Sequence, residues 1–270
     1  MNMKLIIFWD IYWRIWRKAL KKELTNLKDK YNPDFVIANS DNIASWRGII
    51  EKLIPELEYL GIDILTWWDH VFDNDKYIKD YIDKKDSILL RPANFYNTSL
   101  YKIPWVGYKI FEKKSKKLLV IHLLWEVFMK YNVYNPFLKA QEIILWIDKN
   151  DYDEIVIDFH KETTAEWYWL ANFLNWKIAL LYGTHTHVQT NDEMILSKWT
   201  WFISDVWMVW AIDSIIWADY KSVEKRFLTW IQKWKIKQEL SNKYIVNAIY
   251  TELKNWKCIE IEKIKIKSTL

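Results

Sequence analysis

The side chains best suited to chemistry are three histidines that each follow a short apolar run. His185 and His187 stand one residue apart after the run that ends at Gly183, and His160 comes shortly after Ile155-Val156-Ile157. Neutral imidazoles bind zinc, iron, manganese or copper, and ligands at the ends of parallel strands share one crevice. A single His-x-His pair is a weak signal, because buried histidines are common in ordinary cores. The groups upstream therefore decide whether these histidines form a metal site.

Oxygen and imidazole groups also follow the apolar runs of the first 70 residues. In chain order they are Asp10, Asp41, Asn42, Asp69 and His70. Together with the three histidines they exceed the roughly three protein ligands that one catalytic metal uses. They suit two metals about 3.5–4 Å apart, bridged by a carboxylate, an arrangement that activates water for in-line attack on phosphorus. One such aspartate is usually only a cap, but a series of them favours a dinuclear metal site.

The hydrophobic pattern predicts elements that would bring these groups together. Strands are predicted at residues 4–9, 34–38 and 62–66, alternating with a helix over 17–31 and a second helix near 50–57 that Pro55 kinks or divides. This β-α-β-α-β order predicts parallel strands whose carboxyl ends lie along one edge of a sheet.

The second half repeats the order of strand and then functional residue. It predicts a hairpin over 108–124, strands at 154–159, 177–182 and 199–205, and a terminal hairpin about Asn255-Trp256. Helices are predicted over 75–85, 136–147 capped by Asn135, 164–174 and 219–230. His122 falls within an apolar strand run and is interpreted as a structural residue.

Length and charge narrow the class of protein. The 270 residues show no linker, repeat or low-complexity segment, which predicts one domain over 1–270. The net charge of +4 is spread out, so no stable nucleic-acid partner is predicted. The single cysteine, Cys258, fits a reducing compartment, and no run approaches a signal peptide or membrane span. We expect a soluble cytoplasmic protein.

One feature of the composition is abnormal. Glycine is normally about 7% of residues, yet this chain has 4 Gly and 20 Trp. Several tryptophans stand where glycine belongs: Asn175-Trp176 and Asn255-Trp256 resemble the Asn-Gly signal of tight turns. We hypothesise that the gene uses a code in which UGA means glycine, so that these tryptophans are glycines in the native protein. The alternative is an aromatic-rich binding surface.

With tryptophan taken as glycine, the sequence resembles the calcineurin-like metallophosphoesterase superfamily, and within it the YmdB-type phosphodiesterases. The resemblance covers nearly the whole chain, and its most specific motif is 183–192. The other matching segments are 8–10, 36–48, 66–73, 90–95, 158–162 and 203–210. The resemblance implies an α/β fold, an αββα sandwich of two mixed β-sheets flanked by helices, and a hydrolase that acts on phosphodiesters.

The resemblance also implies roles for individual residues. The first metal ion would be bound by Asp10 and His187, with Asn42 beside them, and the second by Asp69, His160 and His185. Asp41 would bridge the metals where the family usually has Glu, and position 69 is usually Asn. His70 matches the non-ligand histidine that acts as general acid or stabilises the developing charge. The cofactors implied are two metal ions, with iron or manganese favoured over zinc.

The substrate implied is a small-molecule phosphodiester such as 2',3'- or 3',5'-cyclic AMP. Phe72, Phe95 and Tyr96 could stack on a nucleobase, but packing explains them equally well. At 123–126 the chain departs from the family, which has Asn, Gln and Arg nearby, so substrate contacts there are unknown. Two alternatives stay open: a phosphomonoesterase or nuclease on the same metals, and a non-enzymatic regulatory protein with a degenerate site. A homo-oligomer is compatible with the sequence.

Overall fold

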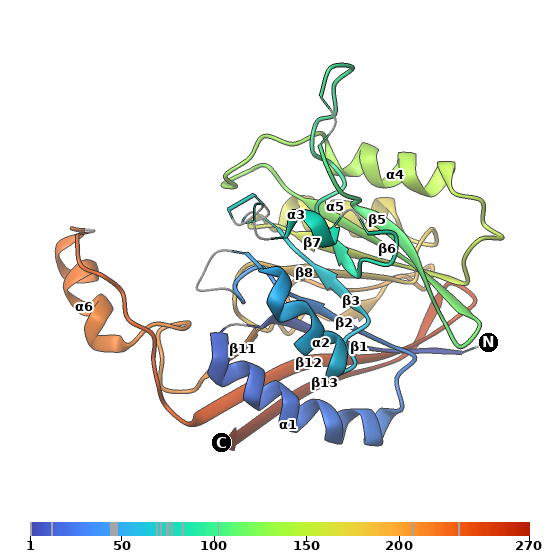
Figure 1. The fold of residues 1–270 in the computed structure, drawn as a ribbon. Helices are drawn as coiled ribbons and strands as arrows, with labels where there is room; N and C mark the ends of the chain where they lie inside the picture. The colour runs from blue at the N-terminus through green and yellow to red at the C-terminus, as the bar shows by residue number, and fades with distance from the viewer. Residues whose placement is uncertain are drawn as a thin grey trace.

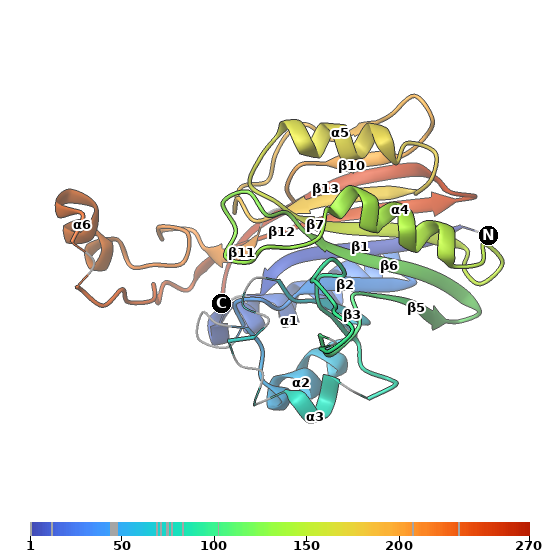
Figure 2. The same ribbon diagram turned by 90° about the horizontal axis from the view of Figure 1, so that it is seen from above.

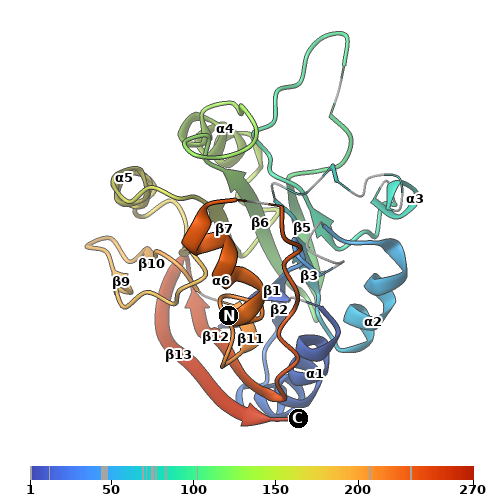
Figure 3. The ribbon, with the colours of Figure 1, turned by 90° about the vertical axis from the view of Figure 1, so that its left-hand side faces the viewer.

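A computed structural model describes most of the chain. The described residues are 2–11, 13–43, 48–68, 70, 72–73, 76, 78–82, 84–101, 103–206, 208–231 and 233–270, with backbone alone for 9–11, 13–16 and 79. Two mixed β-sheets pack face to face, as Figures 1 and 3 show, and helices lie on their outer faces. The predicted α/β sandwich is therefore confirmed.

The first sheet has seven strands in the order β13-β12-β11-β1-β2-β3-β4. Strands β11, β1, β2, β3 and β4 run parallel, and β12 and β13 form an antiparallel hairpin. The bounds are β1 (Met3–Ile11), β2 (Phe35–Asn39), β3 (Ile64–Thr66), β4 (Leu89–Leu90), β11 (Met208–Ala211), β12 (Lys243–Lys254) and β13 (Lys257–Thr269).

The second sheet has six strands in the order β5-β6-β7-β8-β10-β9. Strands β6, β7, β8 and β10 run parallel, while β5 and β9 close the two edges in the antiparallel sense. The bounds are β5 (Tyr108–Lys113), β6 (Lys116–Leu124), β7 (Glu154–His160), β8 (Leu180–Thr184), β9 (Met194–Ile195) and β10 (Trp201–Ile203).

Helices cover the outer face of each sheet, as Figure 2 shows from above. On the first sheet lie α1 (Trp13–Tyr31), the 3-10 turn η1 (Glu51–Leu53), α2 (Ile54–Tyr59) and α3 (Lys79–Ile82), and on the second α4 (Pro136–Trp146) and α5 (Ala165–Phe173). Helix α6 (Tyr220–Thr229) projects away from the sandwich. In the described part of the chain, no helix has the length and apolar character needed to cross a membrane.

The alternation of side chains along β6 divides the core into two layers. Val120 packs in the cluster between the sheets, whereas Leu119 and Ile121 pack in the cluster beneath α4 and α5. Successive side chains of a strand point to opposite faces, so a strand covered on both sides must be apolar throughout. This explains why β7 and β8 are buried at every position and why their runs appear as continuous hydrophobic segments.

Most predicted elements are present, with differences at their ends. Asn135 caps α4 as expected, because its side chain accepts hydrogen bonds from the backbone N–H groups of Phe137 and Leu138. Pro55 divides rather than kinks its helix, since it stands at the start of α2. The helix predicted over 75–85 was too long, because α3 covers only 79–82. Strands β9 and β11 were not predicted.

Among the described residues, five tryptophans have the left-handed backbone conformation that only glycine adopts without strain. Their φ angles are 74° at Trp105, 79° at Trp176, 76° at Trp199, 57° at Trp230 and 65° at Trp256. The Asn255-Trp256 turn joins β12 to β13, as predicted, whereas Asn175-Trp176 links α5 to β8 and is not part of a hairpin. These angles support the hypothesis that glycine is the native residue.

Buried indoles give a second, independent sign of the same kind. The Nε1 atoms of Trp67, Trp105, Trp125, Trp167 and Trp201 are buried and lack a hydrogen-bond partner among the described residues. A buried N–H without a partner costs about 1–3 kcal/mol, and buried polar groups in folded proteins are nearly always paired. Five such donors in the core are what we expect if tryptophan side chains stand where the native protein has glycine.

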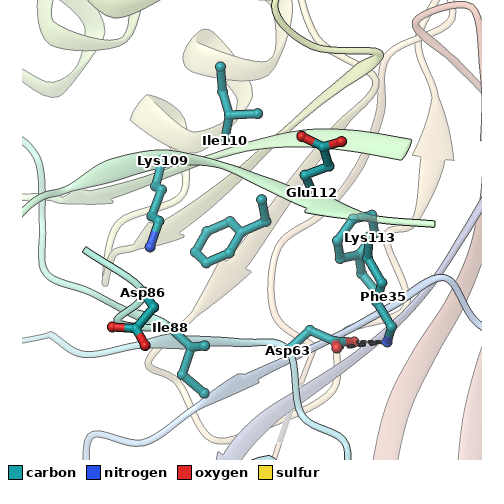
Figure 4. Close-up of a pocket in the computed structure, with 9 residues that line it drawn as sticks. Phe35, Asp63, Asp86, Ile88, Lys109, Ile110, Glu112 and Lys113 are labelled. Atoms are coloured by element: carbon teal, nitrogen blue, oxygen red, sulfur yellow. Dashed lines mark hydrogen bonds and ion pairs between the residues drawn. The ribbon is translucent and has the colours of Figure 1, made fainter. Parts of the chain in front are cut away.

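A hollow of about 410 Å³ opens between the sheets at the amino-terminal ends of the strands. Phe35 begins β2, and Asp63 and Ile88 directly precede β3 and β4. Lys113 spans the opening and donates to both carboxylate oxygens of Asp63 at 2.7 and 2.8 Å (Figure 4). The predicted site residues follow the opposite ends of these strands, so this hollow is separate from them.

The Glu154 carboxylate connects the second sheet to the β12–β13 turn. It is 1% exposed and accepts the backbone N–H of Trp256, with distances of 3.0 Å to Oε2 and 3.3 Å to Oε1. Burial raises the pKa of Glu154 to about 8, and the hydrogen bond from Trp256 offsets only part of that effect. The folded state therefore binds a proton that the unfolded state releases above pH 4.5, and stability falls between pH 4.5 and 8.

We expect Glu154→Gln to stabilise the protein at pH 7, on the order of 3 kcal/mol. The amide oxygen of Gln still accepts the Trp256 N–H, and the cost of a buried charge is removed. Urea unfolding of both proteins at pH 4.5, 6 and 7.5 measures the difference, which should be near zero at the lowest pH and grow with pH. Parallel curves of stability against pH for the two proteins would contradict this role of Glu154.

Candidate metal centre

The predicted site residues lie at the carboxyl ends of strands in both sheets. Asp41 and Asn42 follow β2, and His70 follows β3. His160 is the last residue of β7, and His185 and His187 follow β8. Asp10 lies near the end of β1 with only its backbone described, and Asp69 lies outside the described residues.

The pKa of His160 is affected by all four other histidines of the chain. Burial lowers the pKa of His160 well below its usual value, and the charges of His185, His122, His187 and His70 lower it further. The ring centroids of His160 and His185 are 4.6 Å apart, in an edge-to-face arrangement. Burial and His185 also lower the pKa of His187 to about 3. His160 and His187 are therefore neutral at pH 7, and neutral imidazole is the form that binds metal ions.

His160 fits a metal ligand by its hydrogen bonding. Its Nε2 is buried and has no hydrogen-bond partner in the described part of the chain, which would be costly in a site that stays metal-free. On the other side of the ring, Nδ1 lies 3.4 Å from the Thr184 hydroxyl, which donates to Asp158 at 3.2 Å. A hydrogen-bonded group behind the ring is the usual way to orient a metal-binding histidine.

The two histidines after β8 are held by groups that the sequence did not single out. Glu162 Oε2 lies 2.8 Å from His185 Nε2, and Met208 Sδ lies 3.2 Å from His187 Nδ1. Asp205 fixes the loop between them, because its carboxylate accepts both the backbone N–H and the hydroxyl of Thr186. The spacing His160-x-Glu162 was the one signal in the sequence that could have identified Glu162.

Asp41 joins the ends of β2 and β3. Its side chain is buried, and Oδ1 accepts the backbone N–H groups of Trp68 at 2.8 Å and His70 at 3.3 Å. These two backbone donors hold the carboxylate in one orientation. The carboxylate that was predicted to bridge two metals is thus fixed beside His70.

His70 forms a hydrogen bond with an aspartate three residues later. The distance from His70 Nδ1 to Asp73 Oδ2 is 2.7 Å, and the side chains are 28% and 18% exposed. The other oxygen of Asp73 accepts a hydrogen bond from Lys130 at 2.7 Å. Neither Asp73 nor Lys130 was predicted as a site residue.

The tryptophans next to Asp69 crowd the site. The ring of Trp68 stacks on the ring of His160, with centroids 4.0 Å apart and an interplanar angle of 28°. Trp67 lies close to Gly48: a Cβ atom on residue 48 would be 2.9 Å from the Trp67 ring. Within the described ranges, no three acidic, histidine or cysteine side chains form a group that could hold a metal ion. The ligand set stays a prediction.

Other residues named from the sequence have structural surroundings. His122 lies inside β6, with Nδ1 3.2 Å from the backbone oxygen of Asp158, and burial lowers its pKa to about 3. The ring centroids of Phe72 and Phe95 are 5.3 Å apart, and those of Tyr96 and Tyr134 are 6.2 Å apart. The described structure therefore shows these three aromatic rings packed against other rings of the protein.

Two mixed sheets with histidines and acidic residues at the carboxyl ends of their strands define a class, the metallophosphoesterases. A family model described as YmdB-like protein matches residues 6–264, and the chain belongs to that family. The predicted family, fold class and enzyme class are thus confirmed, and the chain is a hydrolytic metallophosphoesterase.

Three known proteins show the extent of the similarity. A Bacillus subtilis protein named 2',3'-cyclic-nucleotide 2'-phosphodiesterase is 37% identical over 84% of this chain and 83% of its own length. A putative phosphatase/phosphodiesterase of Mycoplasma pneumoniae is 32% identical over 77% of this chain and 72% of its own. A crystal structure described as a novel phosphatase from Mycoplasma pneumoniae superposes with a TM-score of 0.88 and 28% identity, covering 100% of this chain and 95% of that one.

Proposed function

We propose that this protein is a metal-dependent phosphodiesterase that hydrolyses a cyclic nucleotide, of the 2',3'- or 3',5'-cyclic AMP class. The observation that carries the proposal is the buried Nε2 of His160, which lacks a partner among the described residues and belongs to a ring whose pKa burial lowers well below its usual value. The name of the Bacillus subtilis relative supports the choice of substrate. The partner is therefore a small phosphodiester.

The proposed ligands are divided between two metal ions, with iron or manganese preferred to zinc. Asp10 and His187 would hold one ion with Asn42 beside them, Asp69, His160 and His185 would hold the other, and Asp41 would contribute its carboxylate to both. When bound, the two ions supply positive charge to the phosphoryl oxygens and make a nearby water more acidic. The depressed pKa values of His160 and His187 suit this role, because the imidazoles need not lose a proton to bind.

His70 supplies the proton in the proposed reaction. The water oxygen bonds to phosphorus and releases one proton to solvent, the bond from phosphorus to the leaving oxygen breaks, and that oxygen takes the proton that the His70 imidazolium carries on Nε2. Asp73 accepts from Nδ1, which orients the ring, and its carboxylate stabilises the imidazolium that carries the second proton on Nε2. The products are a phosphomonoester and an alcohol, which remain one molecule when the substrate is cyclic.

The test is hydrolysis of 2',3'-cyclic AMP, 3',5'-cyclic AMP and an adenosine monophosphate, with Mn²⁺ and again after chelation. We expect turnover of at least one cyclic substrate that chelation abolishes and Mn²⁺ restores. Turnover of the monophosphate alone would show a phosphomonoesterase and refute the proposal. Turnover that survives complete metal removal would refute the metal centre.

A further inference from the structure

Lys130 connects His70 to the second sheet through Asp73. Lys130 Nζ donates to Asp73 Oδ1 at 2.7 Å, and Asp73 Oδ2 lies 2.7 Å from His70 Nδ1. His70 and Asp73 follow β3 of the first sheet, whereas Lys130 belongs to the segment between β6 and α4 of the second. The three side chains form a chain of hydrogen bonds that crosses from one sheet to the other.

A neighbouring aromatic contact holds the same two segments together. The ring of Tyr131 meets Phe72 edge to face at 5.9 Å, and Lys130 Nζ lies 5.0 Å above the Tyr131 ring. Phe72 lies between His70 and Asp73 in the sequence, so both sides of this turn contact the segment that carries Lys130. A side chain held at two points loses less freedom on forming its hydrogen bond than one held at a single point.

The charges favour an ionised Asp73. Burial acts to raise the pKa of Asp73, but hydrogen bonds from Lys130 and His70 outweigh it and the pKa is lowered. The pKa of Lys130 is raised, mainly by its hydrogen bond to Asp73. An ionised carboxylate only accepts hydrogen bonds, so the hydrogen between the two groups is carried by His70 Nδ1, and the transferable proton is the one on Nε2.

We propose that Lys130 and Asp73 are positioning residues for His70, which hold its ring through Nδ1 so that Nε2 faces the leaving oxygen. The inference builds on the proposed function, because it assigns the orientation of the proton donor. Lys130 acts from the second sheet, so the donor is aligned only while both loops are joined. Removing Lys130 should therefore affect proton donation selectively.

The test compares two substrates that differ in their need for a proton. The leaving group of bis(p-nitrophenyl) phosphate departs without one, whereas the alkoxide of 2',3'-cyclic AMP requires it. Lys130→Met should reduce kcat about tenfold on cyclic AMP and less than about twofold on the nitrophenyl ester, with KM unchanged. Asp73→Asn should show the same selectivity with a larger loss, and Lys130→Arg should restore most of the rate.

Lys113→Met is the matched control. Lys113 forms an ion pair of the same length, 2.7 Å, with Asp63 at the opposite ends of the strands. This control should leave both rates unchanged and should shift the melting temperature no less than Lys130→Met does. Equal losses on the two substrates for Lys130→Met, or no loss on either, would overturn the proposal.

A second readout is independent of turnover. Nitrogen-15 NMR of labelled histidine, recorded at a pH where the ring has lost its second proton, should show the remaining His70 proton on Nδ1 in the original chain and a mixture of tautomers in Lys130→Met. The same spectrum in both proteins would overturn the positioning role. If the original chain hydrolyses neither substrate, the proposed function fails, while the tautomer result still decides the role of Lys130.

Discussion

A chain with glycine at all twenty tryptophan positions is expected to fold more stably than the tryptophan chain and to bind metal ions. Five of the tryptophans have positive φ, which costs a non-glycine residue about 1 kcal/mol or more at each position. Five buried indole N–H groups without a described partner cost about 1–3 kcal/mol each. Glycine removes both costs.

If tryptophan is the native residue, the same substitutions should instead destabilise the protein strongly. Trp67, Trp68, Trp167 and Trp201 are all less than 2% exposed, and truncating a native buried aromatic side chain costs about 3–5 kcal/mol. Four such losses would amount to about 12–20 kcal/mol, whereas a whole domain is stable by about 5–15 kcal/mol. If tryptophan is the native residue, the glycine chain cannot fold, and circular dichroism with thermal melting will show that directly.

Single variants separate the contributions. Trp230→Gly relieves φ = 57° at a side chain that is 82% exposed, so it should stabilise the chain whichever residue is native. Trp68→Gly removes the ring that stacks on His160 and should raise metal binding measured by calorimetry with Mn²⁺. Peptide mass spectrometry of the protein from its own organism identifies the residue. Tryptophan in those peptides would refute the recoding.

The sequence predicted the parts of the site that depend on strand periodicity. His160 and His185 follow buried strands, and the carboxyl ends of parallel strands must meet at one edge, so their proximity follows from the pattern. The failed predictions concern short elements. β11 has four residues and gains its strand conformation from pairing with β1 and β12, so its own sequence contains little signal.

Apart from Glu162, the groups that orient the site could not be predicted, because they depend on contacts between loops. Asp73 and Lys130 are 57 positions apart and meet only because the loops after β3 and β6 come together. Glu162 contacts His185, and Met208 contacts His187. Which group meets which histidine depends on the loop conformation, because the backbone φ angles are 109° at His185 and 58° at His187. Such angles in non-glycine residues reflect tertiary contacts and not local preference.

His70→Ala is expected to retain metal and lose turnover, whereas Asp10→Ala and His187→Ala should lose metal. In our proposal His70 donates a proton and binds no ion, so its removal costs about 10²–10⁴-fold in kcat without changing metal content. The hydrogen bonding of His70 agrees with a role as proton donor and not as ligand, because its Nδ1 contacts Asp73. Asp10 and His187 are proposed ligands of one ion, and losing either should release it.

Metal content by plasma mass spectrometry and kcat on a cyclic nucleotide are measured for the three variants together. Equal metal loss in all three would show that His70 is a ligand, and the proton would then have to come from another group. Full turnover in His70→Ala would remove it from the mechanism altogether. Retained metal with lost turnover would instead assign the proton to His70. The backbone N–H of His70 donates to Asp41, and alanine preserves that contact, so the loss of turnover would come from the missing imidazole.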